Sequence, residues 1–221
     1  MDPLVRINES IQKNELPSEI YEDLVAGANK ARDAIARIEK ASGIKYPEWY
    51  IYPRAIAMGR PPSELSIIYS RFFPFSYEGA LYTVVQVTPP LILYASKDTI
   101  LAVLAHEMLH YVNFVASIRS FSVASDETMT SVFESVFRDE NQLYDPEKVF
   151  RRGRRIIRLL KEKFSMGLND QNLNRRTIKK WFARNLPVEY IAPEDNAVRV
   201  NVSSLLSYTP EESLKRFLNW T

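Results

Sequence analysis

The sequence of 221 residues predicts an α+β fold, in which a small, mostly antiparallel sheet packs on a helix that contains both histidines of the chain. Three observations lead to this prediction. Apolar residues recur at helical spacing between positions 17 and 42, β-branched and aromatic residues cluster between 46 and 96, and helical patterns resume around the histidines and beyond 144. We therefore expect a first domain over residues 1–144 and a basic, mainly helical C-terminal extension over 145–221.

The first element is a helix from about Pro17 to Ser42, with Ser18 as the expected N-cap and Gly43 as the residue that ends it. Its apolar residues fall on one stripe, which predicts the face that packs on the core: Ile20, Leu24, Ala28, Ala31, Ile35 and Ile38.

The strands of the sheet are predicted between residues 46 and 96, where β-branched and aromatic residues are separated by Pro, Gly and Ser. The pairs Pro61-Pro62 and Pro89-Pro90 mark connections, because proline cannot donate a hydrogen bond to a strand ladder. We expect three or four strands, in the segments WYIY, LSIIYSRFF, ALYTVVQV and LILYA.

Two helices follow the strands. The segment SKDTILAVLAHEMLHYVNFVASI predicts a helix capped by Ser96 or Asp98 that runs to about Ser117. After a polar stretch, DETMTSVFESVFRDE predicts a second, acidic helix capped by Ser125.

Beyond Tyr144 the chain is mainly helical by pattern. Asp145-Pro146-Glu147 begins a helix that should end near Gly167, and another helix covers roughly Asn174 to Asn185. VEYIAPEDNAVRVNV resembles a hairpin that turns at Pro193 to Asn196, and the capping box at Thr209 begins a terminal helix.

The composition excludes several classes of site. Because the chain has no cysteine, disulfides, thiolate nucleophiles and cysteine-based zinc sites are excluded, and any metal must be held by histidine and carboxylate. No apolar run reaches the roughly 18 residues of a membrane span, and MDPLVRINES lacks the pattern of a signal peptide. We therefore expect a cytoplasmic protein without a membrane span.

Charge is distributed unevenly along the chain. Residues 1–144 carry 13 basic and 18 acidic side chains, a net −5, whereas residues 145–221 carry 16 basic and 9 acidic ones, a net +7. On a helical wheel, 150–164 separates an apolar face from a face of arginines and lysines. This pattern is typical of a docked helix with a solvated basic face. The alternative is that the region 150–184 binds nucleic acid or an anionic membrane.

The stretch VLAHEMLHYV contains the two histidines of the chain, His106 and His110, with Glu107 directly after the first. Residues four apart on a helix are about 40° apart in rotation and about 6 Å apart along the axis, so both imidazoles can bind one ion. Glu107 can reach a metal-bound water but is poorly placed to be a ligand. This HExxH pattern is typical of zinc hydrolases. Burial of these side chains without partners would cost several kcal/mol, which also favours a metal.

A catalytic zinc needs a third protein ligand, and with no further histidine that ligand must be a carboxylate. The candidates that follow the motif are Asp126, Glu127, Glu134, Asp139 and Glu140.

VLAHEMLHYV followed by DETMTSVF resembles the gluzincin metallopeptidases, the thermolysin-like clan. In that clan a glutamate on a second helix completes the metal site, and Asp126-Glu127 and Phe133 match its pattern. The resemblance therefore implies Zn²⁺ bound by His106, His110 and Glu127. Glu134 is the alternative third ligand, because the site needs a carboxylate. The spacing 127 − 110 = 17 is slightly short for the family, and Ser131 stands where the family has an acid that orients a zinc histidine.

The resemblance covers roughly residues 45–140, and the layout is similar to that of the small archaeal minigluzincins. In that family a strand lines the cleft and pairs with extended substrate. Ala80 to Val87 is the candidate for this edge strand, with an interior strand as the alternative.

The function implied is that of a zinc metallopeptidase of the metalloendopeptidase type, with a peptide or protein substrate. Glu107 would act as general base on the zinc-bound water and pass its proton to the leaving amine. Tyr111, Tyr190 and Arg119 are candidate donors to the oxyanion. The alternative function is a nucleic-acid-binding protein with a structural or degenerate metal site, because the C-terminal order of elements resembles a winged helix.

Overall fold

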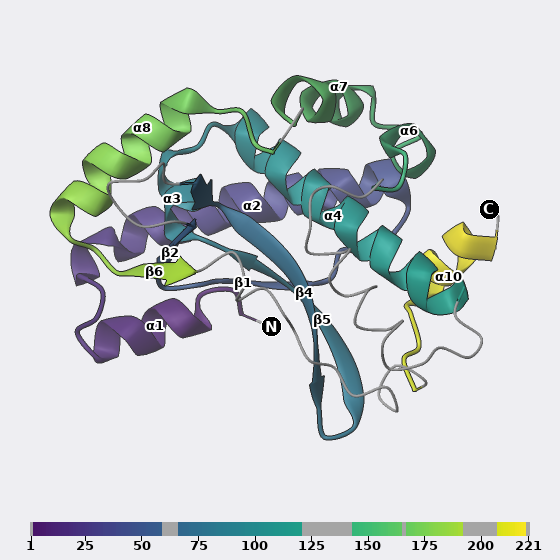
Figure 1. Cartoon of the computed structure of the whole chain (residues 1–221), viewed down its shortest axis with the longest axis horizontal. Coiled ribbons are helices and arrows are strands. Elements are labelled where there is room, and N and C mark those ends of the chain that lie inside the picture. Colours follow the sequence, from purple (N-terminus) through teal and green to yellow (C-terminus); the bar gives the residue numbers. More distant parts are fainter. Residues whose placement is uncertain (1, 59–65, 121–142, 165–166, 192–206, 220–221) are drawn as a thin grey trace.

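The computed structural model describes residues 2–58, 66–120, 143–164, 167–191 and 207–219 (Figure 1). The first part of the chain forms α1 (Val5–Gln12), the 3-10 turn η1 (Ser18–Ile20), α2 (Tyr21–Ser42), β1 (Glu48–Ile51), β2 (Ala55–Met58), β3 (Ser66–Ile68), β4 (Ser70–Tyr77), β5 (Ala80–Val87), α3 (Pro89–Tyr94) and α4 (Lys97–Ser120). The second part forms α6 (Pro146–Val149), α7 (Arg154–Lys163), α8 (Gln171–Lys180), the turn η2 (Phe182–Arg184), β6 (Val188–Ile191) and α10 (Glu212–Asn219).

The fold is α+β, as predicted, but its strands form two small mixed sheets. In sheet A, with the order β1-β5-β4, β5 pairs parallel with β1 and antiparallel with β4. In sheet B, with the order β3-β2-β6, β2 pairs antiparallel with β3 and parallel with β6. The expectation of one mostly antiparallel sheet was therefore wrong. The parallel pairs β1–β5 and β2–β6 each join strands that are not consecutive in the chain, and local sequence patterns do not predict such pairings.

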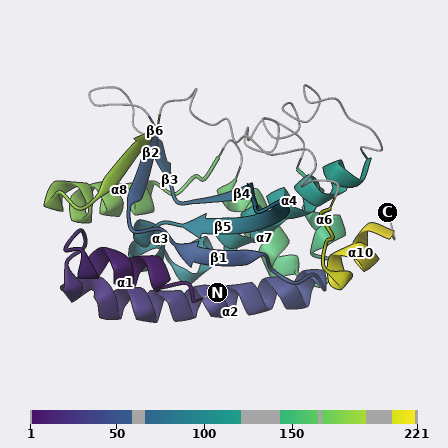
Figure 2. The same ribbon diagram turned by 90° about the horizontal axis from the view of Figure 1, so that it is seen from below.

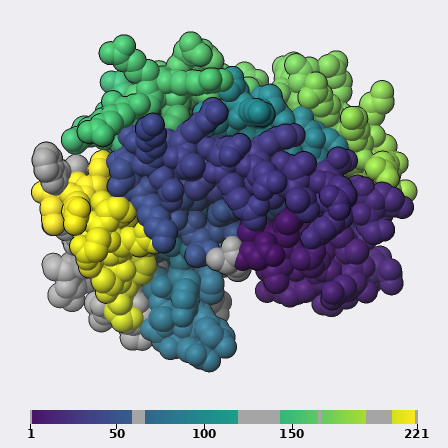
Figure 3. All heavy atoms as spheres, turned by 180° about the vertical axis from the view of Figure 1, so that it is seen from behind, coloured from purple at the N-terminus to yellow at the C-terminus, as the bar shows by residue number. Residues whose placement is uncertain are grey.

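The long helices α2 and α4 pack on each other, and α4 also packs on β4 of sheet A (Figure 2). The stripe predicted for the first helix is buried from Ile20 to Ile38, and Gly43 ends the helix as predicted, with a left-handed φ of 71°. Ser18 lies in η1 and makes no capping hydrogen bond, so this predicted N-cap was wrong. Seen from behind, α2 runs across the surface between α7 and α1 (Figure 3).

Helix α4 is the central buried helix of the molecule. Ser96 caps it, since its Oγ accepts a hydrogen bond from the Thr99 amide at 3.0 Å, whereas Asp98 pairs with Arg155. By length and composition alone, Lys97–Ile118 could cross a membrane, but 83% of its apolar window is buried inside this fold. Core helices show the same property, so the helix does not indicate a membrane span.

The segment LILYA is helical and not a strand. Pro89 and Pro90 occupy the first positions of α3, where a missing amide proton costs nothing, and the apolar residues after them pack on α2. The strand predicted there was therefore wrong, because a short apolar run can be buried as a helix or as a strand. Helix α1 and strand β2 were not predicted.

Gly27 allows α2 and α3 to approach closely. A Cβ atom at this position would overlap Ile92 Cγ2 and lie 2.8 Å from the Ile92 carbonyl oxygen. We expect Gly27→Ala to lower the free energy of unfolding by about 3 kcal/mol, because a packed interface has no room for the methyl group. Urea unfolding would measure this change, with the exposed Lys30→Ala on the same helix as control. In an open site the same substitution stabilises a helix by about 1 kcal/mol, so a more stable variant would show that the close contact is absent.

The C-terminal region begins with two short helices and not with one long helix. Asp145 caps α6 by accepting a hydrogen bond from the Glu147 amide, and the chain leaves the helix at Phe150 before α7 starts after Gly153. A Cβ atom at Gly153 would lie 2.9 Å from Ala41 Cβ, so this break lets the chain pass close to α2. The helix expected from 145 to 167 is thus interrupted.

Residues after 145 share the core of the N-terminal region. The Tyr69 hydroxyl donates to Asn174 of α8 at 2.8 Å and lies 3.1 Å from the Thr177 hydroxyl. Trp181 is fully buried, and β6 supplies the third strand of sheet B. One hydrophobic cluster contains side chains from both sides of position 144.

Candidate functional site

The two histidines lie on one face of α4 and point their imidazoles at each other. Their Nε2 atoms are 3.0 Å apart, and their rings meet edge to face, with centroids separated by 4.6 Å and planes at 82°. His110 is buried and His106 is half-buried. The spacing of four residues therefore brings the two nitrogens together as predicted.

The separation of 3.0 Å fits two arrangements of the pair. In one, a neutral imidazole donates its Nε2 proton to the lone pair of the other. In the other, both nitrogens bind the same ion. Two ligands of one tetrahedral zinc, each about 2.0–2.1 Å from the metal, lie about 3.3 Å apart. A shift of a few tenths of an ångström converts the first arrangement into the second, so the donor pair fits a zinc ion that replaces the shared proton.

Glu107 lies between the histidines in sequence and is 4% exposed. The Ser70 hydroxyl, from the first residue of β4, donates a hydrogen bond to Glu107 Oε1 at 2.5 Å. This length is typical of a hydroxyl that donates to a carboxylate. Ser70 was not among the predicted site residues, because it lies 37 positions before Glu107.

Tyr46, two residues before β1, lies near the same carboxylate. Its hydroxyl donates to the Leu104 carbonyl at 2.9 Å. Burial, and then the charge of Glu107, raises the pKa of Tyr46 well above its ordinary value. The hydrogen bond from Tyr46 therefore holds the turn of α4 that precedes the motif.

Phe164, at the C-terminal end of α7, covers the ring of His106. The two rings stack with centroids 4.1 Å apart and planes within 6°. The sequence placed Phe164 on the apolar face of its helix but gave no signal that this face meets a histidine. The stack restricts the rotation of the His106 ring, so the C-terminal region takes part in positioning the motif.

The predicted oxyanion donors Tyr111 and Tyr190 lie in different surroundings. Tyr111 is 3% exposed, packs on Phe72 with ring centroids 5.9 Å apart, and hydrogen-bonds Tyr208. Burial, and then the interaction with Tyr208, raises the pKa of Tyr111. Tyr190 is 47% exposed on β6, opposite Ala57 of β2. Their role as donors stays a prediction.

The predicted third ligand, Glu127, lies outside the described residues, as do Asp126, Ser131, Phe133, Glu134, Asp139 and Glu140, and so does the side chain of Arg119. In the part of the chain that the structure describes, no three histidine, aspartate or glutamate side chains gather in a group that could hold a metal. The complete ligand set therefore stays a prediction.

The strand Ala80–Val87, the candidate edge strand, is the central strand β5 of sheet A. It pairs with β1 on one side and with β4 on the other, so its alternative prediction as an interior strand is confirmed. In the described part of sheet A, the outer strand nearest the motif is β4, whose first residue contacts Glu107.

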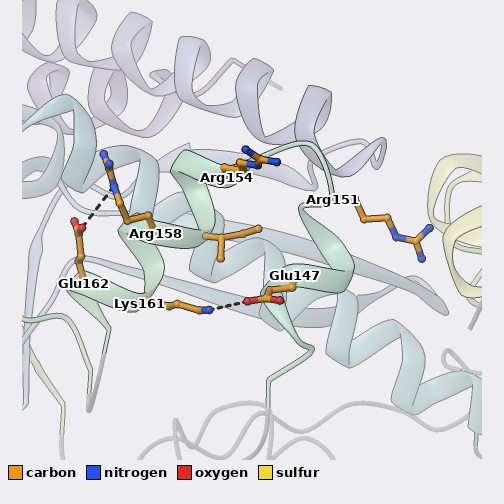
Figure 4. Close-up of a pocket in the computed structure, with 7 residues that line it drawn as sticks. Glu147, Arg151, Arg154, Arg158, Lys161 and Glu162 are labelled. Atoms are coloured by element: carbon orange, nitrogen blue, oxygen red, sulfur yellow. Dashed lines mark hydrogen bonds and ion pairs between the residues drawn. The ribbon is translucent and has the colours of Figure 1, made fainter.

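The basic face of α7 is exposed, as the helical wheel predicted, and Ile156, Leu159 and Leu160 are buried beneath it. Part of its charge is paired: Arg155 with Asp98 at 2.6 Å, Lys161 with Glu147 at 2.6 Å and Arg158 with Glu162 at 3.5 Å. Arg151 and Arg154 extend from the α6–α7 corner in separate directions around a shallow pocket (Figure 4). These cations form a surface and do not converge on a single anion.

The first strand of the predicted C-terminal hairpin, β6, pairs in parallel with β2. In a winged helix the wing strands pair antiparallel with each other. The turn and second strand predicted for this hairpin lie in 192–206, outside the described residues.

Comparison of the chain with protein families, with curated proteins and with solved structures found no match.

Proposed function

We propose that the chain is a zinc metallopeptidase in which His106 and His110 bind the ion and Glu107 acts as the general base. The observation that carries the proposal is the approach of the two Nε2 atoms to 3.0 Å beside a carboxylate that is 4% exposed. Burial of Glu107 and His110 beside the half-buried His106 costs free energy through lost hydration, and a bound metal ion would offset this cost. Glu127 is the proposed third ligand, on the resemblance to gluzincins.

The chemistry at this site is the hydrolysis of a peptide bond. A zinc ion bound by the histidines would supply a Lewis acid that polarises the peptide carbonyl. Glu107 accepts a proton from the attacking water and passes it to the leaving amine. Its burial keeps bulk water away from the carboxylate, which strengthens its interaction with charges that develop in the transition state.

The proposed packing around the site is that of the gluzincin layout. Helix α4 lies against sheet A, with Phe72 of β4 against Phe114 at a centroid distance of 5.6 Å. A peptide substrate pairs with the outer edge of β4, which begins at the residue that contacts Glu107.

The test is metal analysis together with cleavage of casein. We expect about one zinc ion per chain, the ratio of a single catalytic site. Cleavage should stop on treatment with a chelator and return when zinc is added back. A chain that binds no zinc, or one whose zinc is not needed for cleavage, would contradict the proposal.

A second candidate function is supported by the cations of the α6–α7 turn, of α7 and of α8. Arg151, Arg154 and Arg158, and Arg175, Arg176, Lys179 and Lys180, are all exposed. Such a surface suits the phosphates of nucleic acid. The same purified protein would then bind duplex DNA with an affinity that falls as salt rises, and reversal of Arg151 and Arg154 would weaken binding. Reversal of Arg32 and Arg37 on α2 is the matched control, and Arg155 is left unchanged because it pairs with Asp98.

A further inference from the structure

The hydrogen bond from Ser70 to Glu107 joins an outer strand of sheet A to the motif helix. Ser70 Oγ lies 2.5 Å from Glu107 Oε1, and the two residues are 37 positions apart. Ser70 is half-buried and Glu107 is buried, so solvent exchanges poorly with this contact. A hydrogen bond of this kind is stronger than one between neutral groups, because the acceptor is ionised.

The backbone that presents Ser70 is fixed on two sides. The carbonyl of Tyr69 accepts hydrogen bonds from the Thr88 amide at 2.9 Å and from the Thr88 hydroxyl at 3.0 Å. The Tyr69 ring is buried, and its hydroxyl is bonded to Asn174 and lies beside Thr177 on α8. Position 70 therefore starts β4 at a defined place, opposite Val87 in the ladder.

A general base needs a defined orientation as well as a proton affinity, because proton transfer requires a hydrogen-bond distance to the donor. A glutamate side chain has three rotatable bonds, and a carboxylate held only by its own chain samples several orientations. With Oε1 held by the Ser70 hydroxyl, the second oxygen is the one left to accept the proton of water.

We infer that Ser70 is a positioning residue for Glu107: its hydroxyl fixes the carboxylate in the orientation in which it accepts a proton. The inference rests on the proposed peptidase function. Ser70 itself touches neither substrate nor metal in this role, and it acts only through Glu107.

Kinetics of Ser70→Ala and Ser70→Thr test the inference. A hydrogen bond to a charged group contributes about 1.5–3 kcal/mol, which corresponds to roughly a ten- to hundredfold change in rate. We expect Ser70→Ala to lower kcat by this factor, with KM and zinc content unchanged. Ser70→Thr retains the hydroxyl and should restore most of the activity. Ser66→Ala, at an exposed serine of β3, is the matched control.

A double-mutant cycle on Tm measures the Ser70–Glu107 interaction and requires no peptide cleavage. Ser70→Ala should lower the Tm of the chain by several degrees, because the buried carboxylate loses its donor. The same change in a Glu107→Ala background should have little effect, since no carboxylate is left to satisfy.

The outcomes separate the inference from the proposed function. Wild-type activity in Ser70→Ala, loss of zinc in that variant, failure of Ser70→Thr to restore kcat, or additive Tm shifts in the cycle would each overturn the inference. A wild-type chain that cleaves no peptide would overturn the proposed function instead, and the cycle would still decide whether Ser70 holds Glu107.

Discussion

Glu107→Gln is expected to keep its zinc and to lose peptide cleavage. Glutamine cannot accept the proton of the attacking water, and general base catalysis contributes about 10²–10⁴-fold to a rate. The amide oxygen of glutamine can still accept the hydrogen bond that Ser70 makes to Glu107 Oε1 at 2.5 Å, so the fold and the histidine pair should be preserved. Measurement of kcat on a peptide substrate, with zinc content determined on the same sample, checks both parts of the prediction.

The matched control for this substitution is Glu22→Gln, at an exposed position in the first turn of α2. It removes one carboxylate without touching the motif, and kcat should stay at the wild-type value. Full cleavage by Glu107→Gln would remove Glu107 from the mechanism, whereas loss of zinc from that variant would make Glu107 part of the metal site.

His110→Ala is expected to abolish zinc binding and, with it, cleavage. This substitution removes one of the two imidazoles whose Nε2 atoms lie 3.0 Å apart, so His106 is the one proposed nitrogen ligand left on α4. Even residues that only hydrogen-bond a metal ligand contribute about 10–100-fold to affinity, so loss of a ligand should weaken zinc binding by more than about a hundredfold. Competition with a chromophoric chelator measures this affinity directly.

Asn113→Ala provides a control for His110→Ala on the same helix, one turn further along and half-buried. This variant should bind zinc as the wild type does. If His110→Ala retained its zinc, the histidine pair would be a hydrogen-bonded pair and the metal would bind elsewhere in the chain.

Several features that depend on neighbours along the chain were predicted correctly from the sequence, although the Ser18 cap and the strand at LILYA were not. The buried stripe of α2, the left-handed end at Gly43 and the Ser96 cap of α4 each depend on residues within a few turns. The approach of His106 and His110 belongs to the same class, because four residues on a helix fix their geometry.

Features that depend on distant partners were not predicted. The central place of β5 follows from two strands that pair on either side of it, and nothing within Ala80–Val87 distinguishes this place from an edge. Ser70 contacts Glu107 from 37 positions earlier in the chain, and Phe164 contacts His106 from 58 positions later.

A helical wheel drawn through 150–164 misses the break before α7, since the wheel assumes a continuous helix.

The ring of Phe164 on His106 has a consequence for any attempt to shorten this protein. A fragment that stops at Tyr144 would lose the ring that stacks on one face of His106, and it would lose Asn174 and Thr177 of α8, which contact the Tyr69 hydroxyl. Residues 1–144 therefore do not contain all of the contacts that hold the motif in place. A shorter protein would need replacements for the Phe164 ring and for the two α8 side chains beside Tyr69.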